Sequence, residues 1–408
     1  MVDIRPGQAT LNPRPAHLAN SWAEWRMWHI AYKMLTGDRL KYFGLIAGIA
    51  FASLLVAQQA SILVGFSHQT GAFIRDTAQA DLWLMDSQVR FSQDAVPMRD
   101  TVAQLARGVE GVRWAEPLFQ GFTRGKMPDG TRFSLVLVGL NDSTLMGGPP
   151  QMVSGTLADL RRDRAVFIDA GTSTKKLMMK QGGERALQVG DRFSINDNEV
   201  VIAGSYEGRR SFFWEPVVYT TYSRVLTLVP PERNLLSFVL IKLEPGANIS
   251  EVRRQLELRT GKTTLTNEEF IQRTADYILT ETGILINFGM AVALGFLIGT
   301  LVAGQTFYNF TLDNLRHYGA LKAMGVTNLR LTGMVLFQAL LVAALGYGIG
   351  VGLGAATGKY MESTGLAFSM PWQIPVLTAL AILLASLLAA LLSLLQVFKL
   401  EPAVVFKG

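Results

Sequence analysis

Four long apolar runs divide the chain, at residues 43–65, 285–307, 331–356 and 374–398. None of them contains Asp, Glu, Lys or Arg. Because about 20 apolar residues are enough to cross the hydrocarbon core of a bilayer as a helix, the pattern predicts four transmembrane helices. Proton-driven transporters usually need ionisable groups inside their spans, so the same pattern disfavours that class.

A large segment of ordinary soluble composition separates the first two runs. Alternating stretches at 112–126 and 131–140 flank the turn sequence MPDG and predict a β-hairpin, and the Gly- and Pro-rich residues 146–150 mark a boundary. Further strands are expected at 81–85, 165–169, 193–195, 200–204, 217–220, 236–243 and 263–266, and helices at 98–108, 173–180 and 250–259. The predicted fold class is an α+β membrane protein: four transmembrane helices, with a large two-lobed α+β domain between helices 1 and 2 in which the second lobe is inserted into the first.

The helix that leads into the second apolar run is predicted to exceed what a bilayer requires. Thr266 caps it, Glu269 completes a capping box, and no residue obviously breaks it from 267 to 310. At 1.5 Å per residue, this helix would be roughly 65 Å long, about twice the thickness of the hydrocarbon core. The first run also continues without a turn residue to Gly71. Together they predict two stalks that join the membrane part to the soluble domain.

A polar interruption at 311–330 separates the second and third runs. Residues 313–324 have the pattern of an amphipathic helix, and Gly325 supplies a C-terminal stop. A segment this short between two spans cannot form a domain. We interpret it as a helix on the membrane face through which a soluble partner moves the membrane part.

The N-terminal 41 residues are predicted to form an arm followed by an interfacial helix. Asn20 or Ser21 is the expected cap, and Gly37 and Asp38 end the helix before the first span. Rings suited to the headgroup layer lie along one stripe, which either faces that layer or packs on neighbouring spans. The stripe consists of Trp22, Trp25, Trp28, Tyr32 and Leu35.

Charge predicts the orientation in the membrane. The large domain holds 26 Lys and Arg and 26 Asp and Glu, so it is neutral. The two termini and 311–330 together hold eleven cations and five carboxylates, which accounts for the net charge of +6. Since cationic loops stay in the cytoplasm, both termini and 311–330 are expected inside and the large domain outside. The basic balance therefore indicates topology and not nucleic-acid binding.

Small residues at four-residue spacing predict close helix packing. In the first span these are Gly44 and Gly48, and in the glycine-dense third span they are Gly346, Gly350 and Gly354. We expect the glycines of the third span to pack against a second copy of the chain. The Leu-rich fourth span is expected to face lipid.

The chain shows no constellation typical of catalysis. The sequence GKTT at 261–264 resembles the end of a nucleotide-binding loop, but Leu256 stands where the first glycine belongs, so a turn before a strand is predicted. Four scattered histidines supply no zinc set, and the absence of cysteine excludes thiolate metal sites and disulfides. We therefore expect the chain to catalyse nothing alone and to bind no metal or cofactor.

Residues 295–350, with the core YGALKAMG, resemble the permease signature of the MacB/FtsX/LolC group of ABC transporters, closest to its DevC branch. The opening AYKMLTGDRLKYFGLIAGIAFASLL and the closing FKLEPAVVFK resemble the same branch. The large domain adds only its size and position. The resemblance implies a dimeric permease that is gripped by two cytosolic ATPase subunits, which bind ATP and Mg²⁺.

This resemblance also implies a domain plan and a mechanism. Motion of the ATPase is transmitted to the periplasmic domain of an inner-membrane protein, which acts with a periplasmic adaptor and an outer-membrane channel. The implied ATPase-coupling residues are Asp313, Leu315, Arg316, Tyr318, Leu321, Lys322, Met324 and Gly325. The implied parts are a cytoplasmic arm and interfacial helix (1–41), spans at 42–66, 284–310, 331–357 and 374–398, a periplasmic domain at 67–283 with porter-like (67–148, 235–283) and sabre-like (149–234) lobes, the coupling segment (311–330), a short loop (358–373) and a tail (399–408).

Three functions remain open from the sequence. The first is an exporter of amphipathic or lipid-like cargo. Within the same group, lipoprotein release or the regulation of a cell-wall hydrolase competes with it. From another class, a membrane-anchored sensor would bind a ligand outside and signal through 311–330.

Overall fold

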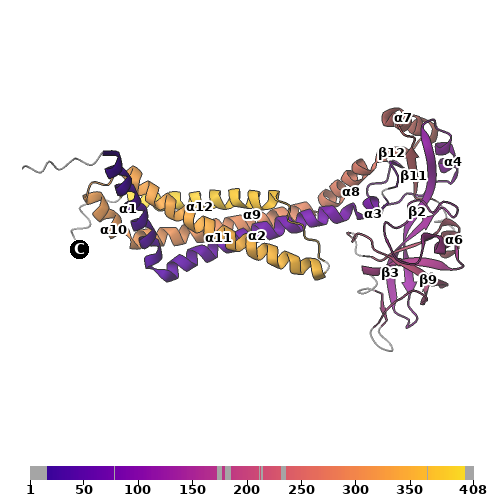
Figure 1. The fold of residues 1–408 in the computed structure, drawn as a ribbon, viewed down its shortest axis with the longest axis horizontal. Coiled ribbons are helices and arrows are strands. Elements are labelled where there is room, and N and C mark those ends of the chain that lie inside the picture. The colour runs from indigo at the N-terminus through magenta and orange to yellow at the C-terminus, as the bar shows by residue number, and fades with distance from the viewer. Residues whose placement is uncertain are drawn as a thin grey trace, which may run out of the picture. The chain divides into compact units, whose positions relative to one another are not determined.

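A computed structural model describes residues 16–77, 79–171, 177–179, 185–210, 212, 215–230, 236–364 and 366–399. The chain forms two compact units, whose elements are labelled in Figure 1. The membrane unit comprises Met1–Val64 and Asn287–Gly408, and the β unit comprises Gly65–Ile286. In the sequence, the β-rich unit is thus inserted between the first and second apolar helices, as the predicted fold class requires.

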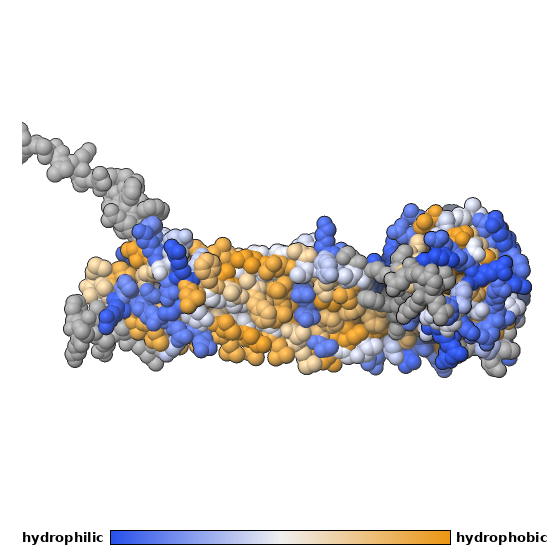
Figure 2. All heavy atoms as spheres, turned by 90° about the horizontal axis from the view of Figure 1, so that it is seen from below, coloured by the Kyte–Doolittle hydropathy of each residue, from blue (hydrophilic) through white to orange (hydrophobic). Residues whose placement is uncertain are grey.

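Six helices make up the described part of the membrane unit. They are α1 (Ala16–Gly37), α2 (Arg39–Thr70), α9 (Ile284–Asp313), α10 (Leu315–Ala323), α11 (Asn328–Thr364) and α12 (Gln373–Lys399). Four of them, α2, α9, α11 and α12, are long and apolar enough to cross a membrane, which confirms the number of predicted spans. Figure 2 shows their apolar surface, with hydrophilic residues gathered at the end of the bundle that α1 and α10 form.

The β unit is built on one sheet of ten strands, in the order β12-β1-β11-β2-β3-β10-β5-β9-β4, with β8 pairing with β2 and β9. Most neighbours are antiparallel, whereas β10 with β3 and β5 with β9 are parallel. The strands are β1 (Leu82–Met85), β2 (Val112–Lys126), β3 (Arg132–Leu140), β4 (Met152–Ser154), β5 (Ala165–Asp169), β8 (Arg192–Ile195), β9 (Asn198–Tyr206), β10 (Val217–Thr221), β11 (Phe238–Leu243) and β12 (Thr263–Thr266), and a separate pair holds β6 (Met178–Met179) and β7 (Arg185–Ala186). The short helices are α3 (Ala72–Asp76), α4 (Thr101–Arg107), the 3₁₀ helix η1 (Leu157–Arg161), α6 (Tyr222–Leu228), α7 (Ile249–Thr260) and α8 (Asn267–Glu281).

Alternation along the strands gives the sheet two buried faces. On one face, Trp83 and Phe238 pack with Phe73 of α3 and Phe270 of α8. The opposite face carries two separate cores. One core lies under α4 and α7 over β1 and β11, and we call this part the α7 lobe. The other joins β5, β8, β9, β10 and α6, and we call it the β9 lobe. The sheet runs through both lobes, because the 15-residue strand β2 pairs with β11 at one end and with β8 at the other.

Several local predictions are confirmed. The hairpin β2–β3 turns at Gly130, which has a φ of +84°, and the predicted strands at 165–169 and 263–266 are β5 and β12. The capping box of Thr266 and Glu269 is present. The first span continues as helix to Thr70, beyond its apolar run.

The predicted unbroken helix from 267 to 310 is wrong. It is two helices, α8 and α9, that meet at Thr282 and Gly283. Gly283 has a φ of +71°, in the left-handed region that glycine enters without steric cost, so the helix of the second stalk is interrupted there.

Two predicted helices near other boundaries also differ. Helix α1 begins at Ala16, so Asn20 and Ser21 lie inside it and do not cap it. The predicted helix at 173–180 lies largely outside the described residues, and its described part holds the short strand β6.

Candidate coupling site

The helix predicted at 313–324 is α10, and Asn314 separates it from α9. At its other end, Gly325 has a φ of +90°. The Gly325 N–H donates to the Lys322 carbonyl (3.0 Å) and the Val326 N–H to the Leu321 carbonyl (3.1 Å). These two bonds make a Schellman motif, in which glycine is favoured at the left-handed position. The predicted glycine stop is therefore confirmed, and it fixes where the chain turns toward α11.

The inner face of α10 is anchored by a buried tyrosine. Tyr318 is completely buried, and this burial raises the pKa of its phenol, which remains a hydrogen-bond donor. Its hydroxyl donates to Gln338 Oε1 on α11 (3.1 Å). Gln338, itself 1% exposed, donates through Nε2 to the carbonyl of Ala31 on α1 (2.8 Å). One buried chain of hydrogen bonds thus ties α10 to both α11 and α1.

The outer face of α10 and of the turn after it is open. Met324 is 73% exposed and Leu329, in the first turn of α11, is 82% exposed, while Arg316 is also exposed. Leu315 and Lys322 are half-buried. Of the residues expected to contact the ATPase, Tyr318 is buried, and Leu321 is half-buried and packs on the core of the membrane unit. The exposed surface is centred on Arg316, Met324 and Leu329 instead.

An ionic contact joins the ends of two spans beside α10. Lys41, near the start of α2, forms ion pairs with Asp313 at the end of α9 and with Asp38 (3.2 Å). These side chains are 38% to 53% exposed, so solvent screens the pairs and they contribute little to stability. The contact positions the start of α10 more than it stabilises the fold.

The aromatic stripe of α1 packs in part on a neighbouring span, which is one of the two predicted surroundings. Trp28 packs on Phe337 of α11, with ring centroids 5.0 Å apart, while 38% of it stays exposed. Leu35 is fully buried and Tyr32 is 45% exposed. The side chains of Trp22 and Trp25 lie outside the described part of the chain.

The glycines of the third span pack within the chain. A Cβ at Gly346 would meet Ile49 Cγ2 at 2.6 Å, and one at Gly350 would meet Ser53 Cβ at 2.6 Å and the Leu54 nitrogen at 2.9 Å. Gly354 faces the same helix at ordinary contact distance. The space that the sequence assigns to a second copy is therefore filled by α2. In the first span, a Cβ at Gly48 would meet Val302 of α9, whereas a Cβ at Gly44 would meet no atom within 4 Å.

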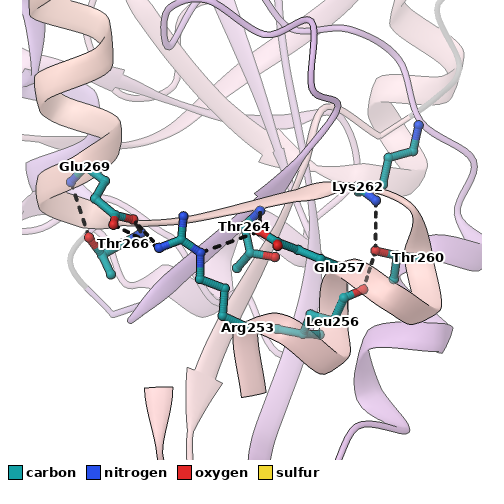
Figure 3. Close-up of polar contacts among 8 residues, drawn as sticks. All are labelled: Arg253, Leu256, Glu257, Thr260, Lys262, Thr264, Thr266 and Glu269. Carbon is teal, nitrogen blue, oxygen red and sulfur yellow. Dashed lines mark hydrogen bonds and ion pairs between the residues drawn. The ribbon is translucent and has the colours of Figure 1, made fainter. Parts of the chain in front are cut away.

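The first turn of α8 takes part in a polar cluster with α7 (Figure 3). Thr266 N–H donates to Glu269 Oε2 (2.9 Å), and the Glu269 N–H donates to Thr266 Oγ1 (3.2 Å). Arg253 of α7 donates to the same carboxylate through Nη1 (2.8 Å). The first turn of the stalk helix α8 is thereby fixed to α7.

No nucleotide or metal site accompanies these contacts. Gly261 ends α7 in the left-handed conformation, and Lys262 pairs with Asp86 (2.6 Å), so GKTT forms the predicted turn before β12. Within the described residues, no three His, Asp or Glu side chains gather closely enough to hold a metal ion. The contacts described here link helices at their ends.

Comparison with known families decides what kind of protein this is. Residues 42–258, more than half of the chain, match the family described as MacB-like periplasmic core domain, and residues 284–402 match FtsX-like permease C-terminal. The chain belongs to the MacB/FtsX group of ABC permeases. Permeases of this group are subunits of ABC transporters and are not enzymes themselves. The two matches establish the group and do not distinguish its DevC branch.

Solved structures similar to this MacB/FtsX permease cover about half of it. The extracellular domain of the noncanonic ABC-type transporter YknZ from Gram-positive bacteria is 17% identical and covers 46% of this chain and 98% of its own, with a TM-score of 0.33. The periplasmic region of MacB from Actinobacillus actinomycetemcomitans is 13% identical (49% and 94% covered, TM-score 0.37). A domain of a putative permease protein from Porphyromonas gingivalis is 15% identical (45% and 85%, TM-score 0.32). No curated protein matches the chain.

Two features of the permease site were not predicted. Gln338 carries the only amide side chain in its apolar run, and that position was the available signal. The contact of Lys41 with Asp313 joins residues 272 positions apart, and nothing local in the sequence points to it.

We expect Tyr318→Phe to destabilise the permease. The change removes only a hydroxyl but leaves the buried Gln338 Oε1 without its donor, which costs about 1–3 kcal/mol. The measurement is thermal unfolding of the full chain in detergent. Tyr32→Phe, the same change on a ring that is 45% exposed, is the control. Equal midpoints for the two variants would show that the buried bond contributes nothing.

The Glu269 cluster predicts a pH dependence. Hydrogen bonding to the Thr266 backbone, followed by Arg253, lowers the pKa of Glu269 in the folded chain. A lowered folded-state pKa stabilises the fold above the unfolded-state value and loses that contribution as the pH falls through the folded-state value. Glu269→Gln should therefore lower the unfolding temperature at neutral pH, and the deficit should shrink on acidification below about pH 4, near the ordinary glutamate pKa. A deficit that stays constant with pH would contradict the assignment.

Proposed function

We propose that this chain is the permease subunit of an ATP-driven ABC exporter of the mechanotransmission type, of the DevC kind. A separate cytosolic ATPase, in two copies, binds the outer face of α10 and its flanking turn. The membrane unit lies in the bacterial inner membrane with both termini and α10 in the cytoplasm and the β unit in the periplasm. Movement of α10 passes through the stalks to the β unit, and the cargo does not cross between the spans.

The observation that carries this proposal is the open face of α10 and of the turn after it, inside the segment (residues 284–402) that matches FtsX-like permease C-terminal. Met324 exposes an apolar side chain to solvent, which is unfavourable. A partner that buries this side chain gains the corresponding free energy. Arg316, which is also exposed on α10, provides a charge for an acidic partner surface. The inner face is hydrogen-bonded to α11 and, through Gln338, linked to α1, which supports transmission of movement beyond α10.

A second copy of the chain is proposed to pack on α9. Within the chain, only 11% of the apolar window of α9 is buried, against 39–44% in the other three spans. The exposed side chains of α9 include Met290, Leu294, Leu297 and Leu301. This face replaces the glycines of the third span as the proposed dimer contact.

The cargo is proposed to be amphipathic or lipid-like, taken up on the periplasmic side and passed through an adaptor to an outer-membrane channel. The four apolar runs contain no Asp, Glu, Lys or Arg, which supports a route outside the bundle. Lipoprotein release and regulation of a cell-wall hydrolase are the competing roles within the group.

Co-purification tests the proposal. The tagged chain, expressed with a candidate ABC ATPase from the same genome, should retain that ATPase in detergent and change its hydrolysis rate after joint reconstitution into nanodiscs. A sensor would retain no ATPase. Recovery of the chain without any ATPase, under conditions where both are folded, would contradict the proposed function.

A further inference from the structure

A carboxylate at the end of the first stalk, that of Asp76, is hydrogen-bonded to a loop of the β9 lobe. Asp76 ends α3, the short helix that directly follows α2, and its side chain is 8% exposed. Its Oδ2 accepts the backbone N–H of Arg209 (2.8 Å), and its Oδ1 accepts Nη1 of the same residue (2.6 Å). Arg209 lies between β9 and β10. One carboxylate thus holds both the backbone and the side chain of that loop.

Two further contacts and one steric constraint lie around the Asp76–Arg209 contact. Asp169, at the end of β5, accepts the N–H of Gly208 (3.2 Å). A Cβ at Gly208 would meet Tyr206 at 2.9 Å and Asp76 Oδ2 at 3.3 Å, so only glycine lets the loop approach the carboxylate this closely. Phe66, in the outer part of α2, packs edge-on against Phe212 with ring centroids 5.7 Å apart.

The polar contacts of the second stalk helix lie elsewhere on the sheet, although α8 also packs on α3 in the core that holds Phe73 and Phe270. The polar contacts of α8 reach α7 through Glu269 and Arg253 (Figure 3) and reach β1 through Asn267, whose Oδ1 accepts Trp83 Nε1 (2.7 Å). Thr274 of α8 accepts the N–H of Ser92, in the loop after β1 (3.1 Å). The described polar contacts of α8 thus fall on the α7 lobe side, whereas those of Asp76 fall on the β9 lobe.

From this division we infer that the two stalks act on two different places of one sheet, and that Asp76 and Arg209 form the contact through which α2 moves the β9 lobe. Helix α2 continues to Thr70 and Gly71 separates it from α3, while Gly283 interrupts the other stalk. In this inference, displacement of one stalk against the other twists the sheet between the lobes. Asp76 is then a positioning residue for transport. The inference rests on the proposed function, because it takes the stalks to be driven by an ATPase.

The test is a distance measurement that needs no cargo. The chain contains no cysteine, so spin labels at Val189→Cys (β9 lobe) and Leu258→Cys (α7 lobe) are specific, and both sites are exposed. The labelled full chain, diluted into unlabelled chain, is reconstituted with its ATPase in nanodiscs. The distance between labels is recorded by pulsed electron resonance without nucleotide and with ATP and vanadate. In the labelled chain that keeps Asp76 and Arg209, the distance between the labels is expected to change on ATP binding.

Asp76→Asn keeps the size of the side chain but removes the charge that pairs with Arg209. The nucleotide-dependent population shift should fall about fivefold or more, while ATPase binding and cargo-free hydrolysis are kept. Arg209→Ala, which truncates a side chain that is 58% exposed, should have the same effect and serves if Asp76→Asn does not fold. Loss of ATPase binding in the parent chain would instead sink the proposed function.

The matched control is Asp81→Asn. Asp81 also accepts a cation, Lys242 Nζ (2.6 Å), and a backbone N–H, that of Leu243 (2.9 Å), but both lie within the α7 lobe. This variant should retain the distance shift. The inference is overturned if Asp76→Asn and Arg209→Ala shift like the parent, if Asp81→Asn loses the shift equally, or if the parent shows no shift.

Discussion

Gly350→Val is expected to prevent correct packing of the membrane unit, whereas Gly352→Val, two residues along the same helix, leaves it intact. A Cβ at Gly350 would contact the Ala50 carbonyl oxygen and lie 2.6 Å from Ser53 Cβ, so α11 would have to move away from α2. Backbone cannot yield as a flexible side chain does, and overpacking of this kind costs about 1–3 kcal/mol or more. A Cβ at Gly352, by contrast, would meet no atom within 4 Å.

The two variants are compared by the yield of monodisperse protein in detergent and by thermal unfolding. A low yield and a lower midpoint for Gly350→Val alone would agree with the structure. If Gly352→Val were the more damaging change, the face of α11 that packs on α2 would be assigned wrongly.

Met324→Glu is expected to uncouple the ATPase without unfolding the permease. Met324 is 73% exposed, so an acidic side chain there is tolerated in the chain alone. In a complex it would place a charge in an apolar contact, and loss of such an anchor costs about 2 kcal/mol or more, which is more than tenfold in affinity. The measurement is the affinity of the reconstituted permease for its ATPase, together with the hydrolysis rate.

Leu258→Glu is the control for this change, because Leu258 is also apolar, is 71% exposed and lies on α7 in the other unit. It should bind the ATPase as the parent does. Normal ATPase binding by Met324→Glu would remove the turn after α10 from the proposed contact.

Local patterns in the sequence carried the predictions that are confirmed. The hairpin β2–β3, the capping box of α8 and the glycine stop after α10 each depend on residues within a few positions of one another. The four spans follow from length and hydrophobicity alone. For these features, propensity and tertiary structure agree.

The features that were missed depend on distant partners. The parallel pairing of β3 with β10 joins strands that lie far apart in the sequence, so it is invisible to periodicity. Spacing showed that Gly346, Gly350 and Gly354 share a face, but it could not show that α2 covers this face. An amphipathic pattern likewise placed Tyr318 and Met324 on one helix without showing which of them points toward the core. The break at Gly283, just before the second apolar run, depends on the backbone conformation of a single residue.

A crosslinking experiment tests the central claim, that the segment around α10 meets an ABC ATPase. Because the chain has no cysteine, Met324→Cys and Lys359→Cys each give one attachment site for a maleimide-linked photo-crosslinker, at opposite ends of the span α11. In membranes that also contain the ATPase, the crosslinker at position 324 should yield an adduct with the ATPase and the one at 359 should not. An adduct from 359, or none from 324 while the ATPase is bound, would contradict the account.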